Sequence, residues 1–168
     1  MERYERAYEL SKNEVKLKKM PGKVAKPAFK AFKECDFQLF RDILYAYKRK
    51  IETSPQKVDR RLNRNLHIML ADSFQLDFYH HRAVDVYLDA VKGAPFNRSF
   101  IKELANVYFL LGEYKNSANQ YKRFLRVSGM RNSKTQTAFG FRQLGYCHYF
   151  LKEYKQASEF FRRSFAIV

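Results

Sequence analysis

The stretch LANVYFLLGEYKNSANQYKRFL, residues 104–125, decides the fold of this chain. Its small residues Ala105 and Ser117 and its aromatic residue Tyr121 recur at helical spacing on either side of the dipeptide Gly112-Glu113. This pattern is typical of two amphipathic helices joined by a tight turn. A small residue on each helix lets the two backbones approach closely, and the aromatic ring fills the space beside them. The stretch therefore predicts a helix-turn-helix hairpin.

The same pattern occurs three times along the chain. Leu70-Ala71, Leu104-Ala105 and Leu144-Gly145 align at spacings of 34 and 40 residues. The longer spacing contains a polar segment, residues 128–133, where an insertion costs little. Repetition at such a period is the signature of a stacked helical array. The residues that we expect to pack the repeats together are Ala71, Ala83, Tyr87, Ala105, Tyr121, Gly145, Ala157 and Phe161.

These hairpins resemble the tetratricopeptide repeat (TPR) family over residues 64–168. The resemblance implies an all-α fold, a right-handed α-solenoid of helix-turn-helix repeats, with three repeats at 64–97, 98–131 and 138–168. The chain departs from the family pattern at His148, where an aromatic residue is usual, and at Lys152, where the turn glycine is usual.

Upstream of the repeats the pattern is weaker. We predict a degenerate helical hairpin and linker at residues 28–63 that caps the array. Asp36 is expected to cap its second helix, and Ser54-Pro55 to end it. A long helix over residues 56–78 is then expected to lead into the first repeat. Residues 1–27 are predicted to form a basic N-terminal arm or short helix.

Composition limits the classes of protein to which the chain can belong. Its 168 residues suffice for one domain, and 33 Lys and Arg against 17 Asp and Glu give a net charge of +16. Cys35 and Cys147 form neither a disulfide framework nor a metal-ligand motif, and no apolar run is long enough for a transmembrane helix. We therefore expect a cytoplasmic protein; a position peripheral to a membrane-bound assembly is the alternative.

Signatures of catalysis are missing from the sequence. It contains no glycine-rich phosphate loop, HExxH motif or GxSxG motif. His80-His81 is the best pair for a metal, but adjacent helical side chains diverge and no third ligand is near, so a surface turn is the better interpretation. We expect no enzymatic activity, no cofactor and no metal.

The concave face of a TPR array is supplied by the first helix of each repeat, and partners bind there. The positions expected to face the groove are Asn65, Ile68, Asp72, Gln75, Ser99, Lys102, Asn106, Phe109, Phe139, Arg142, Tyr146 and Tyr149. Lys102 and Asn106 match positions at which TPR cochaperones grip a C-terminal carboxylate. That clamp is incomplete, because Ile68, Asp72 and Gln143 stand at other clamp positions.

The predicted partner-binding groove consists of Lys102, Asn106, Phe109, Arg142, Tyr146 and Tyr149. Its cations and aromatic rings suit a protein segment with acidic and apolar side chains. The alternative is a groove that is solvated or filled by the chain itself.

A lysine-rich segment forms a second candidate site. Eight lysines and one acidic residue lie between Lys12 and Lys33. The predicted basic patch consists of Lys16, Lys18, Lys19, Lys23 and Lys26. It could bind an anionic membrane surface, a nucleic acid or an acidic protein, and the alternative is a solvated arm.

Together these observations favour a non-enzymatic scaffold or adaptor whose repeats bind protein partners in a multiprotein assembly. One alternative is a secretion-type cytoplasmic chaperone, although chaperones of that class tend to be acidic. The other is a basic helical-repeat protein that binds RNA or an anionic membrane surface. The sequence leaves the oligomeric state open.

Overall fold

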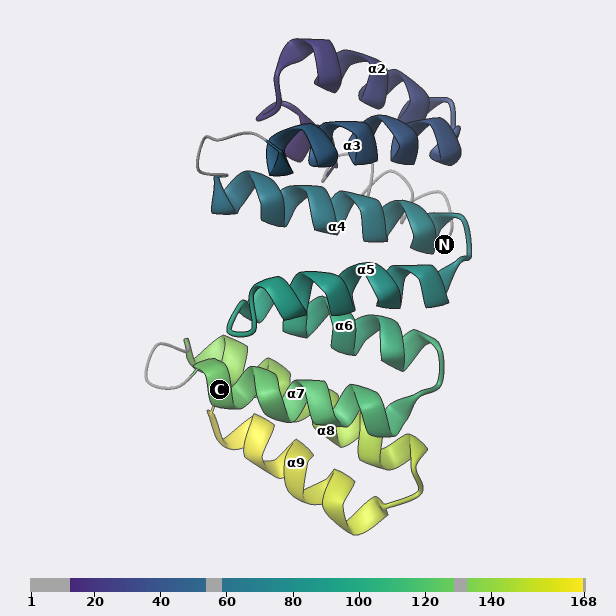
Figure 1. The fold of residues 1–168 in the computed structure, drawn as a ribbon. Helices are drawn as coiled ribbons and strands as arrows, with labels where there is room; N and C mark the ends of the chain where they lie inside the picture. Colours follow the sequence, from purple (N-terminus) through teal and green to yellow (C-terminus); the bar gives the residue numbers. More distant parts are fainter. Residues whose placement is uncertain (1–12, 54–58, 129–132, 168) are drawn as a thin grey trace. The chain divides into compact units, whose positions relative to one another are not determined.

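A computed structural model describes residues 13–53, 59–128 and 133–167, and these residues contain helices and no strand. Residues 13–17 form a short helical segment, and the longer helices follow it in chain order (Figure 1). They are α2 (Gly22–Lys33), α3 (Phe37–Glu52), α4 (Arg60–Leu76), α5 (His80–Gly93), α6 (Arg98–Leu110), α7 (Tyr114–Ser128), α8 (Lys134–Phe150) and α9 (Tyr154–Ile167).

The chain divides into two compact units, residues 1–86 and residues 87–168, with the boundary inside α5. In the first unit α2 packs on α3, and α3 packs on α4. Its core centres on aromatic and aliphatic side chains that are almost fully buried. These are Phe32, Phe40, Leu44, Leu66, Met69 and Leu70.

The second unit is a sequential stack in which α6 packs on α7, α7 on α8 and α8 on α9. A chain of hydrogen bonds crosses its core. The Cys147 thiol donates to Ser117 Oγ over 3.3 Å, and the Ser117 hydroxyl donates to the Ala105 carbonyl over 2.9 Å. Residues from three successive helices are thereby joined where the small side chains allow close approach.

Short polar residues cap the helices. Asp36 accepts a hydrogen bond from the Leu39 amide at the start of α3, so the predicted N-cap is confirmed. Asn97 and Ser133 cap α6 and α8 in the same way. Each cap satisfies a backbone N–H that the first helical turn leaves unpaired.

The turn of each repeat places one residue in the left-handed backbone region. Phe78, Gly112 and Lys152 have φ angles of 61°, 75° and 62°, and they occupy the same position of their repeats. Only Gly112 adopts this conformation without steric cost. Lys152 therefore keeps the turn geometry of the glycine that it replaces.

Two helices begin at other residues than predicted. Pro21 stands at the N-cap of α2, so the helix starts at once at Gly22 and continues through Pro27. The helix expected over residues 56–78 spans only Arg60–Leu76, because Asp59 caps it by accepting from the Arg61 amide. The predicted end at Ser54-Pro55, residues 1–12 of the arm and most of the 128–133 insertion lie outside the described residues. The predicted domain boundaries stay a prediction.

Candidate partner-binding surfaces

The α6 part of the predicted groove is a network of hydrogen bonds that starts in the core. The buried Tyr121 hydroxyl donates to Asn106 Oδ1. The Asn106 amide donates to Glu103 Oε2 over 2.9 Å, and Lys102 Nζ lies 2.9 Å from Glu103 Oε1. Lys102 is thus already paired with an acidic side chain of its own helix. An incoming carboxylate must compete with Glu103 for this lysine.

The α8 part of the predicted groove is more open. Arg142, Tyr146 and Tyr149 are all exposed, and their spacing of four and three residues places them on one face of α8. The Arg142 guanidinium lies 5.9 Å from the centre of the Phe139 ring, within the range of a cation–π contact. We call these three residues the α8 row. The α8 row therefore presents a cation and two half-exposed aromatic rings to solvent.

Phe109, the remaining predicted groove residue, belongs to an aromatic cluster. Its ring makes edge-to-face contacts with Tyr114 and Phe150, at centroid distances of 5.3 and 5.5 Å. Tyr114 and Phe150 are themselves stacked at 4.8 Å. Phe109 is half-buried in this cluster, so it contributes to packing as well as to the surface.

The predicted packing residues are buried, apart from Phe161, which is half-buried. Among these packing residues, a particularly close approach is at Gly145 in α8. A Cβ atom added there would lie 2.6 Å from two ring atoms of Phe161 in α9. The absence of a side chain at residue 145 is therefore what allows this ring to rest on the α8 backbone.

In the first unit, the N-terminal segment covers the predicted groove face of α4. Lys16 Nζ lies 3.1 Å from Asp72 Oδ2, and both side chains are largely buried. Leu17 and Met20 join the same hydrophobic core as α4. Asp72 and Asn65, which were expected to face a groove, are buried. Here the chain itself fills the expected groove.

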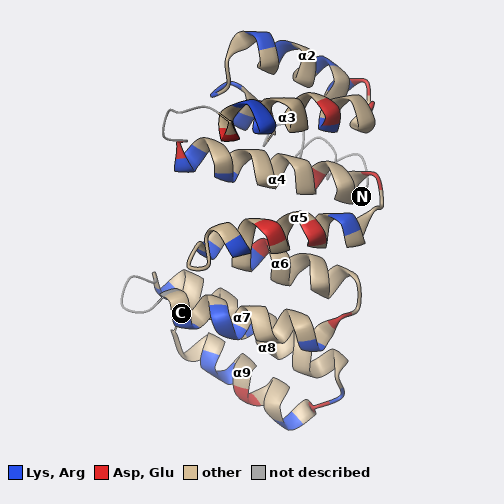
Figure 2. Ribbon diagram, in the orientation of Figure 1, with Lys and Arg blue, Asp and Glu red and all other residues tan. Residues whose placement is uncertain are grey.

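The lysines of the predicted basic patch have different surroundings. Lys16 is held by Asp72, whereas Lys18, Lys19, Lys23 and Lys26 are exposed. Lys18 pairs with Glu14 at 3.0 Å. Figure 2 shows that α2 carries several Lys residues along its length.

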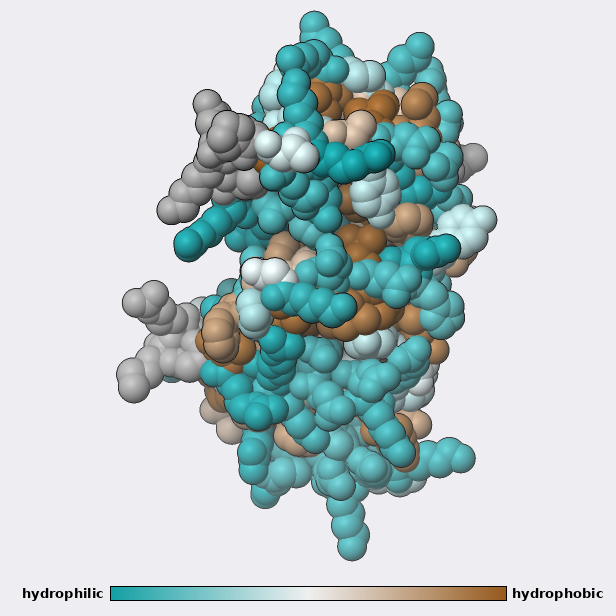
Figure 3. Space-filling model, in the orientation of Figure 1, coloured by the Kyte–Doolittle hydropathy of each residue, from teal (hydrophilic) through white to brown (hydrophobic). Residues whose placement is uncertain are grey.

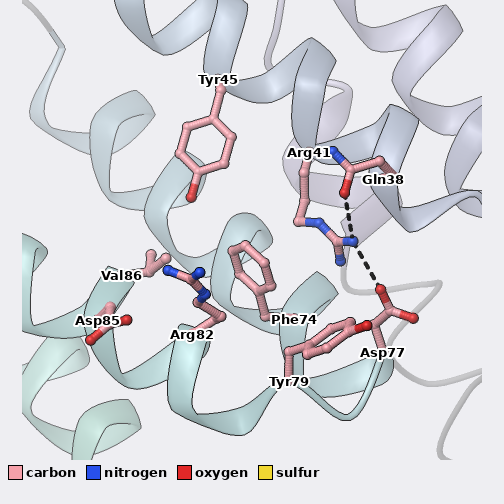
Figure 4. Close-up of a pocket in the computed structure, with 9 residues that line it drawn as sticks. All are labelled: Gln38, Arg41, Tyr45, Phe74, Asp77, Tyr79, Arg82, Asp85 and Val86. Carbon is pink, nitrogen blue, oxygen red and sulfur yellow. Dashed lines mark hydrogen bonds and ion pairs between the residues drawn. The ribbon is translucent and has the colours of Figure 1, made fainter.

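A cavity of about 610 Å³ opens in the first unit between α3, the end of α4 and the start of α5 (Figure 4). Its most buried polar residue is Arg41, which donates to Asp77 over 2.8 Å and to Gln38 over 3.3 Å, and lies over the Phe74 ring at 4.6 Å. Arg82 and Asp85 complete the charged lining. The two arginines and two carboxylates balance, and Arg41 is engaged in holding α3 to α4. Sequence analysis missed this pair because its partners are 36 residues apart in no recognisable motif.

Three titratable side chains of the second unit, Tyr121, Cys147 and His148, are buried and pack in its core. Burial raises the pKa of Tyr121 and of the Cys147 thiol above their ordinary values. His148 is buried, stacks on Phe160 at 5.0 Å and bonds to Glu153, as expected of a substitute for an aromatic residue. Among the described residues no group of three His, Cys, Asp or Glu is placed to hold a metal ion. None of the described helices has the length and apolar character needed to cross a membrane.

No protein-family model matches the sequence, and no curated protein matches it either. Solved structures do match. MamA AMB-1 has a TM-score of 0.59 at 13% identity, and the match covers 96% of this chain and 90% of that chain. MamA MSR-1 has a TM-score of 0.59 at 15% identity, and the match covers 96% of this chain and 88% of that chain.

The fold is that of a TPR-like helical solenoid. MamA has this architecture, and the match extends over nearly the whole of both chains. The predicted all-α class with helix-turn-helix repeats is therefore confirmed. At this level of identity the likeness concerns the fold alone.

Proposed function

We propose that this protein is a non-enzymatic scaffold or adaptor that binds a protein segment with acidic and apolar side chains. The observation that supports the proposal best is the α8 row, Arg142, Tyr146 and Tyr149. Aromatic rings and arginine are the residue types that contribute most to binding at protein interfaces. The structure leaves all three exposed on one helix face.

The chemistry of the α8 row suits a particular kind of partner. The Arg142 guanidinium can hold a carboxylate through two parallel hydrogen bonds. The Tyr146 and Tyr149 rings offer apolar faces with polar hydroxyls at their ends. Lys102 adds positive charge from α6, weakened by Glu103. We expect the net charge of +16 to favour acidic partners by attracting them over longer distances.

Selection from a peptide library on the purified chain tests this function. The peptides enriched should carry acidic and apolar residues, and Arg142→Glu should weaken their binding by at least about tenfold. Lys122→Glu is the matched control, since it makes the same charge change at an exposed position of α7. Figure 3 shows that the drawn face over α7 is mainly hydrophilic. Equal losses in both variants would show that only net charge matters and would contradict the proposal.

A second candidate function is binding of an anionic surface through α2. It is favoured by the exposure of Lys23, Lys26 and Lys30 on this helix. Replacing these three lysines by glutamine should then abolish retention on RNA or on vesicles with anionic lipid, whichever of the two retains the wild-type chain. Retention on neither would rule this function out. The location in the cytoplasm remains part of the proposal.

A further inference from the structure

An apolar cavity of about 610 Å³ lies open on α9, apart from the α8 row except for Tyr149, which belongs to both. It is lined by a stripe along one face of α9, consisting of Tyr154, Ala157, Ser158, Phe161, Arg162 and Phe165. Phe165 is 80% exposed and Tyr154 is 59% exposed. Among the described residues, the exposed rings of this stripe form a contiguous apolar surface beside charged side chains, and such a surface marks a site of interaction.

The repeats themselves show what such a stripe binds. The equivalent positions of α7 are occupied by Ala118, Tyr121 and Leu125, and α8 packs over them. In α9 these positions are Ser158, Phe161 and Phe165. The repeat geometry thus provides a seat for a helix beside α9 of the same kind as the seat that α8 occupies on α7.

The contact between α8 and α7 also shows which side chains fit the seat. Gly140 of α8 comes so close to Leu125 of α7 that an added Cβ would lie 2.6 Å from a Leu125 methyl. Phe165 is larger than Leu125, so a helix placed on α9 needs a small residue at this point as well. An apolar stripe with a small residue at its centre is thus the required pattern.

Charge decides between a second copy of this chain and another protein. The stripe contains Arg162 and is flanked by Lys155 and Arg163, and Glu159 pairs with both arginines. Two copies, each with a net charge of +16, would repel each other. We propose that the α9 stripe docks an acidic amphipathic helix of a partner protein, in the position that α8 takes on α7. This site shares Tyr149 with the α8 row but contains neither Arg142 nor Tyr146.

A peptide that copies α8 is the probe. It has the sequence of residues 134–150, with Cys147→Ala and with glutamate at the exposed positions 134, 136 and 142. A second peptide carries lysine at those three positions. Fluorescence anisotropy with the whole chain should show saturable binding of the acidic peptide, about tenfold tighter than that of the basic one. Phe165→Ser should weaken binding of the acidic peptide by at least about tenfold, because an exposed aromatic anchor is lost.

Phe96→Ser is the matched control, since Phe96 is 81% exposed and lies outside the stripe. It should leave binding unchanged, and circular dichroism should show that both variants keep their helices. Equal losses in the two variants, or no saturable binding to the wild type, would overturn the proposal. Sedimentation velocity supplies a further check: a dimer that Phe165→Ser dissociates would assign the stripe to a second copy and overturn it too. Phe165 lies outside the α8 row and Arg142 lies outside the α9 stripe. Loss of binding in Arg142→Glu but not in Phe165→Ser would assign this peptide to the α8 row, which would overturn the present proposal and leave the proposed function standing.

Discussion

Gly145→Ala tests one of the two closest glycine packing contacts among the described residues of the second unit. The added methyl would lie 2.6 Å from Cδ1 and Cε1 of Phe161 and 2.9 Å from Cζ. A ring cannot bend away from such a contact, and tilting it would disturb its edge-to-face contact with Tyr146 at 5.2 Å. Overpacking costs about 1–3 kcal/mol, and two ring atoms at 2.6 Å place this contact in the upper half of that range, at about 2–3 kcal/mol. Alanine regains about 1 kcal/mol because it is the better helix former. We expect a net loss of about 1–2 kcal/mol in the free energy of unfolding.

Whether Gly145→Ala lowers or raises the free energy of unfolding should depend on the presence of the Phe161 ring. In a Phe161→Ala background the clash is absent, so Gly145→Ala should stabilise the protein by about 1 kcal/mol through helix propensity alone. Urea unfolding followed by circular dichroism at 222 nm gives the four free energies of this double-mutant cycle. Gly93→Ala is a control, because a Cβ at Gly93 would meet nothing within 4 Å. A Gly145→Ala variant as stable as the wild type, or no coupling with Phe161, would refute the packing argument.

Three further predictions concern the turn, the core and the thiols. Lys152→Gly should stabilise the protein by about 1 kcal/mol, because φ is 62° at this residue. Lys122→Gly, at an exposed position in the interior of α7, should instead destabilise it by about 1 kcal/mol, and urea midpoints measure both changes. Tyr121→Ala should cost about 3–5 kcal/mol and Tyr121→Phe about 1 kcal/mol. Because burial raises the pKa of Tyr121, its ionisation opposes folding: wild-type stability should fall as pH rises above 10, and less steeply in Tyr121→Phe. A negligible shift for Tyr121→Ala would show that its ring does not fill the core. Cys35 is exposed and should react at once with Ellman's reagent, whereas the buried Cys147, whose pKa is raised, should react only on unfolding. Prompt reaction of both thiols would contradict the burial of Cys147.

Local patterns made the repeat fold predictable from the sequence. The small and aromatic residues around Ala105, Tyr121 and Gly145 recur at a fixed register, and each pattern needs only the residues of one hairpin and its neighbour. The Asp36 cap was predictable for the same reason, since it acts on an amide three residues away. The start of α2 was not predicted: the hairpin was expected from residue 28, whereas the helix begins at Gly22 and continues through Pro27, since a proline can remain inside a helix at the cost of one hydrogen bond.

Contacts between distant residues could not be predicted. Lys16 and Asp72 are 56 residues apart, and a lysine within a lysine-rich run gives no sign that it has a carboxylate partner. The pairing of Lys102 with Glu103 was equally hidden, since neighbours in a helix usually point apart. Both pairs have the same consequence. Lys16 and Lys102, which were predicted to bind partners, instead form ion pairs with carboxylates of the same chain.

These internal ion pairs reduce the part of the predicted groove and basic patch that is available to a partner. Asp72 is covered by the N-terminal segment and Lys102 is paired with Glu103, whereas the α8 row and the α9 stripe each keep aromatic rings and a cation exposed together. Tyr149 belongs to both surfaces, because it lies on the exposed face of α8 and also lines the cavity on α9. A substitution of Tyr149 would therefore disturb either kind of binding and could not tell them apart. Arg142 and Phe165 each belong to one surface only, so the pattern of their separate effects identifies which surface a given partner uses.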